Sequence, residues 1–222
     1  MAKNRNQKCP ENRPSDPLDG FEDEMTALAE SEENASARRG KNRRSSVLSH
    51  GIEFDSNEEV DVYEWLLEAE RLGLVTGIVY QPESFVLFDG LRNEKGKLVV
   101  RPHVYTADFR FTLTEDWRTL QRTQKFKIFH RLVPDDGTVY IDVKGAFNRF
   151  GGDRNFGVNS KWVLAKYGVY VWKVEPKDLF SKTWLPEACR LTRKTHCVSK
   201  KYGRFLTFEH HGFKAPSSDD HK

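Results

Sequence analysis

Residues 138–144, TVYIDVK, decide the fold, because apolar and polar side chains alternate along them. Neighbouring side chains of a β-strand point to opposite faces of a sheet, so Val139, Ile141 and Val143 share one face. Asp142 and Lys144 emerge together on the other face. We therefore predict a central strand that buries an apolar face and presents a carboxylate and an ammonium group opposite it.

Residues 103–113, HVYTADFRFTL, show a similar alternation. One face is expected to be a core face, formed by Tyr105, Ala107, Phe109 and Phe111. The opposite face carries Asp108, together with Val104, Thr106 and Arg110. If the two strands are neighbours, each sends one acid away from the core, and Asp108 and Asp142 converge.

The remaining pattern predicts an α/β fold. Residues 56–72 are expected to form a helix, with Ser56 as its N-cap and Gly73 just past its end. Residues 159–166 predict a second helix. Further strands are expected at residues 77–81, 84–88, 125–132 and 169–174. Because strands outnumber helices, we expect a central mixed β-sheet flanked by helices.

The first predicted helix supplies a third acid, Glu59. It precedes Leu66 by seven residues, which places it on the buried stripe rather than on the polar side, where Glu58 and Asp61 are expected. A structural interpretation is also open, because Ser56-x-x-Glu59 is a capping box in which the glutamate accepts a hydrogen bond from the Ser56 amide. A glutamate can cap a helix and still face a metal.

Converging carboxylates beside an ammonium group suit a hard divalent cation. Mg²⁺ takes oxygen ligands, usually a few carboxylates completed by water and substrate phosphate. Such a cation lowers the pKa of bound water and neutralises charge that builds on a phosphodiester. A neighbouring lysine can orient the attacking water and help to stabilise the transition state. Asp108, Asp142 and Lys144 therefore indicate chemistry that depends on Mg²⁺ or Mn²⁺.

Several short motifs together carry a resemblance to a known family. They are residues 54–59 (FDSNEE), 81–85 (QPESF), 105–109 (YTADF), 142–145 (DVKG) and 160–162 (SKW). In this order and spacing they resemble the PD-(D/E)XK nuclease superfamily, and more closely its small phage-encoded endonucleases, from residue 51 to residue 174. The sequence departs from the pattern at Ala107, where the superfamily has its name-giving proline, and in a long insertion before Asp142.

The resemblance implies a restriction-endonuclease-like core in which Asp108 and Asp142 ligate the metal, and in which Glu59, the acid of the first helix, is a further metal ligand and catalytic residue. Lys144 is then the catalytic lysine. The implied activity is a Mg²⁺- or Mn²⁺-dependent endodeoxyribonuclease that leaves a 5′-phosphate, with a role in phage DNA processing, either resolving branched DNA or degrading host DNA. Two other functions stay open: a non-cleaving nucleic-acid-binding module of a larger complex, and a nuclease directed at RNA.

Composition divides the chain into three parts. Residues 1–47 hold blocks of opposite charge without apolar periodicity, so we expect a disordered charged tail. Residues 48–180 form the predicted nuclease core, in which residues 114–136 are longer than a hairpin needs and are expected to be an inserted hairpin or arm. Residues 181–222 form a basic C-terminal extension. Nucleic-acid contacts are expected from Arg154, Lys161, Lys166, Arg193, Lys194, Lys200 and Lys201.

The bulk composition limits the classes of protein. The 222 residues carry a net charge of +3, and no apolar run approaches the ~20 residues that cross a bilayer, so we expect no membrane partner. Three cysteines are too few for a disulfide framework and fit a reducing compartment. We expect a cytoplasmic protein, in the host cytoplasm if phage-encoded, with DNA as its partner; a homodimer stays open.

Overall fold

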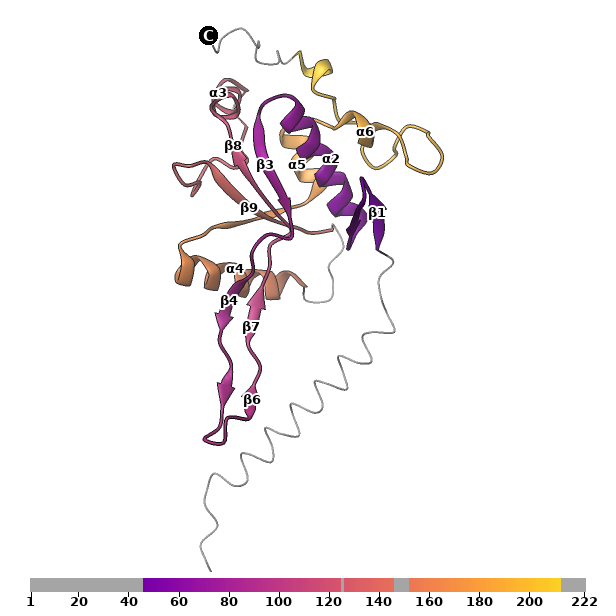
Figure 1. The fold of residues 1–222 in the computed structure, drawn as a ribbon. Coiled ribbons are helices and arrows are strands. Elements are labelled where there is room, and N and C mark those ends of the chain that lie inside the picture. The colour runs from indigo at the N-terminus through magenta and orange to yellow at the C-terminus, as the bar shows by residue number, and fades with distance from the viewer. Residues whose placement is uncertain (1–45, 125, 146–151, 213–222) are drawn as a thin grey trace, which may run out of the picture. The chain divides into compact units, whose positions relative to one another are not determined.

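The computed structural model describes residues 46–124, 126–145 and 152–212 (Figure 1). Of the predicted tail over residues 1–47, all but the last two residues lie outside this part of the chain. Strand β1 (Val47–Ser49) pairs antiparallel with β2 (Ile52–Phe54). No helix of the described residues is long and apolar enough to cross a membrane.

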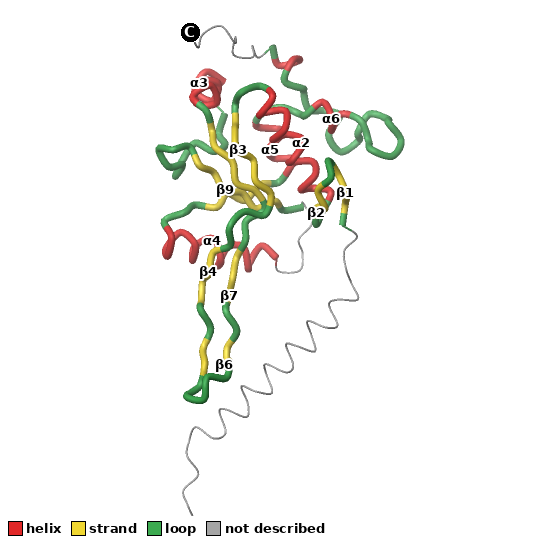
Figure 2. Tube along the Cα trace, viewed as in Figure 1, coloured by secondary structure: helices red, strands yellow, loops and turns green. Residues whose placement is uncertain are grey.

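Four strands form the central sheet, in the order β10-β9-β8-β3. Figure 2 labels β3 and β9 of this sheet, with strands drawn in yellow. β9 (Thr138–Val143) pairs antiparallel with β8 (Phe109–Leu113) and parallel with β10 (Val171–Val174). β3 (Val75–Tyr80) lies antiparallel to β8 on its other side. The predicted mixed sheet is therefore confirmed, and residues 138–143 occupy an inner strand, as the alternation predicts.

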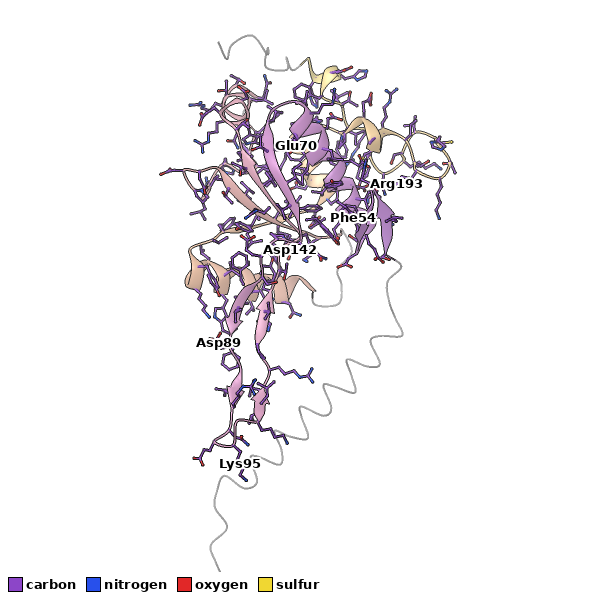
Figure 3. All side chains as sticks on the ribbon, in the orientation of Figure 1. Phe54, Glu70, Asp89, Lys95, Asp142 and Arg193 are labelled. Atoms are coloured by element: carbon purple, nitrogen blue, oxygen red, sulfur yellow. The ribbon has the colours of Figure 1, made fainter. Side chains whose placement is uncertain are left out.

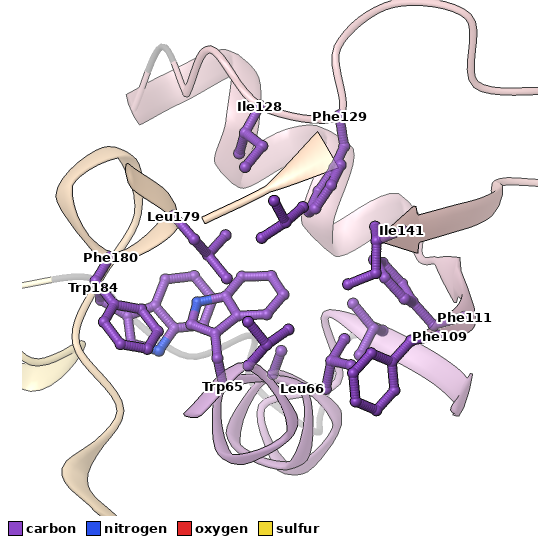
Figure 4. Close-up of a cluster of buried hydrophobic side chains, with 14 of the residues drawn as sticks. Trp65, Leu66, Phe109, Phe111, Ile128, Phe129, Ile141, Leu179, Phe180 and Trp184 are labelled. Atoms are coloured by element: carbon purple, nitrogen blue, oxygen red, sulfur yellow. The ribbon is translucent and has the colours of Figure 1, made fainter. Parts of the chain in front are cut away.

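Helix α2 (Asn57–Arg71) begins and ends close to its predicted bounds. Ser56 is the N-cap, and its hydroxyl accepts a hydrogen bond from the Glu59 amide. The helix buries Trp65 against Trp184, with ring centroids 5.0 Å apart, and the Trp65 indole donates to the hydroxyl of Thr183 at 3.1 Å (Figure 4). The amphipathic stripe of α2 thus anchors an aromatic core.

The two faces of the sheet bury separate apolar clusters. The larger cluster contains Val139 and Ile141 of β9 together with the buried apolar residues of α2. The smaller one contains Tyr140 of β9 and Val163 of helix α4 (Gly152–Tyr167), with residues of β4 (Phe85–Phe88) and β7 (His103–Tyr105). The alternation expected along residues 138–144 is confirmed, and α2 and α4 cover opposite faces of the sheet (Figure 1).

The prediction of one strand over residues 103–113 is wrong, because the chain breaks between β7 and β8. The Asp108 amide donates to the Ile141 carbonyl at 3.0 Å, although Phe109 is the residue paired with Ile141. An extra residue of this kind reverses the alternation. Tyr105 and Ala107 consequently belong to the smaller cluster instead of sharing a core face with Phe109.

Residues 114–136 form neither a hairpin nor an extended arm in their described part. Thr114 caps helix α3 (Glu115–Gln124), since its hydroxyl accepts from the Trp117 amide at 3.2 Å. The described residues 126–132 follow an irregular path, without the strand expected over residues 125–132. Three of its side chains enter the larger cluster with Trp117, namely Phe126, Ile128 and Phe129. The alternation of aromatic and basic residues in this segment fits a strand, but it fits equally well a loop whose apolar side chains are buried in the core.

The segment expected to be a basic extension also belongs to the folded unit. It contains the short helices α6 (Glu187–Arg190) and η1 (Glu209–His211), which follow α5 (Pro176–Lys182). Its side chains in the larger cluster are Trp184, Leu185, Cys189, Tyr202 and Phe208. Residues 184–208 therefore contribute to the core and do not simply trail from it.

Residues 90–101 belong to a compact unit separate from the one that contains the sheet. Within them, β5 (Leu91–Arg92) pairs antiparallel with β6 (Leu98–Val100). The chain enters this hairpin from β4 and leaves it toward β7.

Candidate functional site

Asp142 lies on β9, on the side of the sheet that α4 covers, and only 4% of it is exposed (Figure 3). One carboxylate oxygen, Oδ2, accepts a hydrogen bond from the Tyr105 hydroxyl at 2.6 Å. The other, Oδ1, forms an ion pair with the Lys144 ammonium group. The predicted pairing of Asp142 with Lys144 is thus present, and Tyr105 joins it.

Asp108 reaches the same point from the start of β8. Its Oδ2 accepts a hydrogen bond from the Val143 amide at 2.5 Å. Burial, the charge of Asp142 and a smaller effect of Glu59 raise the Asp108 pKa to about 7, against the opposing effects of the Val143 hydrogen bond and Lys144. Asp108 therefore lies close enough to Asp142 for their charges to interact.

Glu59 is buried, but its carboxylate is already engaged at the start of α2. Oε1 accepts from the Ser56 hydroxyl at 2.8 Å, and Oε2 accepts from the Asp55 amide at 3.0 Å and the Tyr80 hydroxyl at 2.9 Å. Burial and the Glu59 charge raise the pKa of Tyr80, so the phenol remains a donor. The capping interpretation holds with the Asp55 amide in place of the Ser56 amide, while the Glu59 charge still acts on Asp108.

The acids fit a divalent cation that the substrate helps to bind. Among the described residues, no group of three or more His, Cys, Asp and Glu side chains is arranged to hold a metal ion. Mg²⁺, however, commonly takes only one or two carboxylates and completes its shell with water and substrate phosphates. The raised pKa of Asp108 reflects an excess of negative charge at this point, which a bound cation would relieve.

Two acids of α2 lie differently from their predicted polar positions. Asp61 is only 7% exposed and accepts hydrogen bonds from Tyr202 at 2.6 Å and Arg193 at 2.5 Å. Its position four residues before the buried Trp65 is a signal that could have placed it on the inner face. Glu58 is half-buried beside Gly145, the residue after Lys144, and pairs with Lys201 at 3.1 Å.

The predicted nucleic-acid contacts that the structure describes lie on different elements and have different partners. Lys161, Lys194 and Lys200 are exposed. Lys166 donates to the Val86 carbonyl at 2.8 Å, and Arg193 and Lys201 are held by the acids of α2. The side chain of Arg154 lies outside the described residues.

No protein-family model matches this chain, and no curated protein or solved structure is significantly similar to it. The function is therefore inferred from the motifs and from the geometry of the site.

Proposed function

We propose that this protein is a Mg²⁺- or Mn²⁺-dependent endonuclease that hydrolyses DNA phosphodiester bonds, built on a PD-(D/E)XK, restriction-endonuclease-like core. One observation carries the proposal: the buried Asp142, paired with Lys144, and the half-buried Asp108 lie close enough together for the charge of Asp142 to raise the pKa of Asp108. Like charges in a buried site cost stability, and such perturbed groups concentrate at functional sites.

Each residue of the site has a part in this proposal. Asp108 and Asp142 would hold the cation, and Tyr105 fixes the orientation of the Asp142 carboxylate. When bound there, a divalent cation would supply an activated water and neutralise charge on the phosphate. Lys144, already directed at the site by Asp142, orients the attacking water and offsets charge on the phosphoryl oxygens. Glu59 ties the start of α2 to Tyr80 of β3, and its charge acts on Asp108.

A non-cleaving DNA-binding module is the rival interpretation. Two carboxylates beside a phosphate-binding surface would weaken binding by repulsion, and a pure binder gains nothing from burying them. The geometry therefore favours catalysis. We further propose a role in phage DNA processing in the host cytoplasm, with branched DNA or host DNA as the substrate.

The proposal is tested with supercoiled plasmid and the purified chain. With Mg²⁺ or Mn²⁺ we expect nicked or linear DNA with 5′-phosphate ends, and EDTA should stop the reaction. Asp142→Asn removes a metal ligand without changing side-chain size, so cleavage should fall by more than the roughly 100-fold typical of residues that support a ligand. Binding of the same DNA should persist.

Asp178→Asn is the matched control, because Asp178 is an exposed acid that pairs with Lys182 on α5. It should cleave like the unaltered chain. Cleavage by Asp142→Asn at the unaltered rate would sink the proposal. A panel of duplex, single-stranded, flap and four-way-junction DNA, with duplex RNA beside them, then identifies the preferred substrate and tests the RNA alternative.

A further inference from the structure

The hairpin over residues 90–101 has a tightly defined turn. The Asn93 side-chain oxygen accepts from the backbone amides of Lys95, at 3.1 Å, and Lys97, at 2.9 Å. Gly96 adopts a φ of 77° and donates to the Asn93 carbonyl at 2.8 Å, while the Arg92 guanidinium donates to the Gly96 carbonyl. The turn therefore fixes the backbone that carries Lys95, which is labelled in Figure 3.

The charge of this hairpin is concentrated. Its cations are Arg92, Lys95, Lys97 and Arg101, and its one acid is Glu94, so residues 90–101 carry +3. The entire chain carries the same net charge. All five charged residues are exposed. A two-stranded hairpin on its own is at best marginally stable in water. Its concentrated, exposed positive charge suits contact with an anionic partner.

We propose that this hairpin enters a groove of double-stranded DNA and contacts the phosphates on either side. A two-stranded β-ribbon fits the major groove of B-form DNA, which is about 12 Å wide, whereas the major groove of duplex RNA is too narrow to admit side chains. Lysine and arginine at the turn replace counterions of the phosphate backbone. This inference rests on the proposed nuclease function for the identity of the substrate. It adds that the DNA substrate contains a B-form duplex segment.

The test measures binding in the Asp142→Asn background, so that no cleavage intervenes. The hairpin variant combines Arg92→Ser, Lys95→Ser and Lys97→Ser. The control variant, Arg71→Ser with Lys177→Ser and Lys182→Ser, removes the same charge from exposed positions on α2 and α5. Both are titrated with a DNA duplex and with one of its single strands over a series of salt concentrations.

We expect the duplex affinity of the hairpin variant to fall about tenfold or more at low salt. The slope of log K against log salt should become shallower by about 0.9 for each phosphate that the hairpin no longer neutralises. The affinity of this variant for the single strand should fall no further than that of the control. Should the triple variant unfold, Lys95→Ser and Lys97→Ser alone should each give part of the same effect.

Equal duplex affinities of the hairpin and control variants would overturn the inference. An equal reduction on duplex and single strand would overturn the groove placement, because contact with any phosphate chain would then explain it. The nuclease proposal is tested separately, because it fails if the unaltered chain cuts no DNA with either metal. If the hairpin variant then still binds duplex DNA more weakly than the control variant, the hairpin inference stands without the nuclease proposal.

Discussion

At the residue scale, the carboxyl group of Asp108 makes the stability of the folded chain depend on pH. Its pKa of about 7 lies above the usual 3.8 because of burial and the Asp142 charge. Between these values the folded chain binds more protons than the unfolded chain, so the contribution of Asp108 to stability is complete below pH ~4 and is lost as pH rises through ~7.

Asp108→Asn removes this titration and keeps a hydrogen-bond acceptor for the Val143 amide. In EDTA, the free energy of unfolding of the unaltered chain, relative to Asp108→Asn, should fall by about 3 kcal/mol between pH 5 and pH 8. Urea unfolding at several pH values measures the difference. A difference that stays constant over this range would contradict the raised pKa. The same variant should cleave no DNA.

Tyr105 is the positioning residue that alternation placed on the wrong face. Burial and the Asp142 charge raise the pKa of its phenol, so it remains a donor to Asp142. Tyr105→Phe keeps the ring in its cluster but frees one carboxylate oxygen. We expect cleavage to fall about 10- to 100-fold, with a higher Mg²⁺ concentration needed for half-maximal rate.

The Mg²⁺ dependence separates this role from packing alone. Tyr167→Phe is the control, since its exposed hydroxyl donates only to the Val86 carbonyl, and it should leave the Mg²⁺ dependence unchanged. If Tyr105→Phe lowers thermal stability without moving the half-maximal Mg²⁺ concentration, the tyrosine is structural.

These residues also show how far side-chain alternation reaches. It predicted correctly that Asp142 lies on the face opposite Val139, Ile141 and Val143, because β9 is regular. It failed at Tyr105, because one extra residue beside Ile141 reverses every side chain before it. The hydrogen bond between Tyr80 and Glu59 could not be predicted from alternation either, since it depends on how α2 packs on β3.

At the scale of elements, helix α3 is the main departure from prediction. Sequence signals for it exist, namely the Thr114 cap and the acids Glu115 and Asp116 in its first turn. The strands β3, β4, β9 and β10 were recognisable from local pattern alone. The irregular segment after α3 could not be recognised in this way, because its apolar side chains are buried by tertiary contacts and do not belong to a strand.

If residues 114–136 are part of the core, shortening a buried side chain there should lower the free energy of unfolding as much as it does elsewhere in the core. Trp117 is fully buried and lies against Trp65 with ring centroids 5.8 Å apart. Trp117→Ala should lower the free energy of unfolding by about 3–5 kcal/mol. Arg122→Ala, on the exposed side of α3, should change it by no more than about 0.5 kcal/mol. Equal, small effects in urea unfolding would restore the separate-arm interpretation.

At the scale of the whole chain, the C-terminal segment and α2 hold each other in place. Tyr202 and Arg193 bond to Asp61, and Lys201 bonds to Glu58, which lies beside Gly145 after the proposed catalytic lysine. These partners are separated by more than 130 positions in sequence. No local sequence pattern predicts contacts between residues so far apart in sequence. The basic composition of residues 181–222 therefore suggested a DNA-binding extension instead.

Truncation distinguishes a structural segment from a dispensable one. A chain ending at Lys182 lacks the buried side chains of Trp184, Leu185, Tyr202 and Phe208. Burying each such side chain contributes about 1.5–3 kcal/mol, so their sum is comparable with the whole stability of a domain, about 5–15 kcal/mol. We expect this chain to lack a cooperative thermal transition by circular dichroism. A chain ending at Gly212 keeps all four residues and should unfold like the full chain. If the shorter chain also melts cooperatively at the same temperature, residues 183–212 serve binding alone, and their contacts with α2 add nothing to the fold.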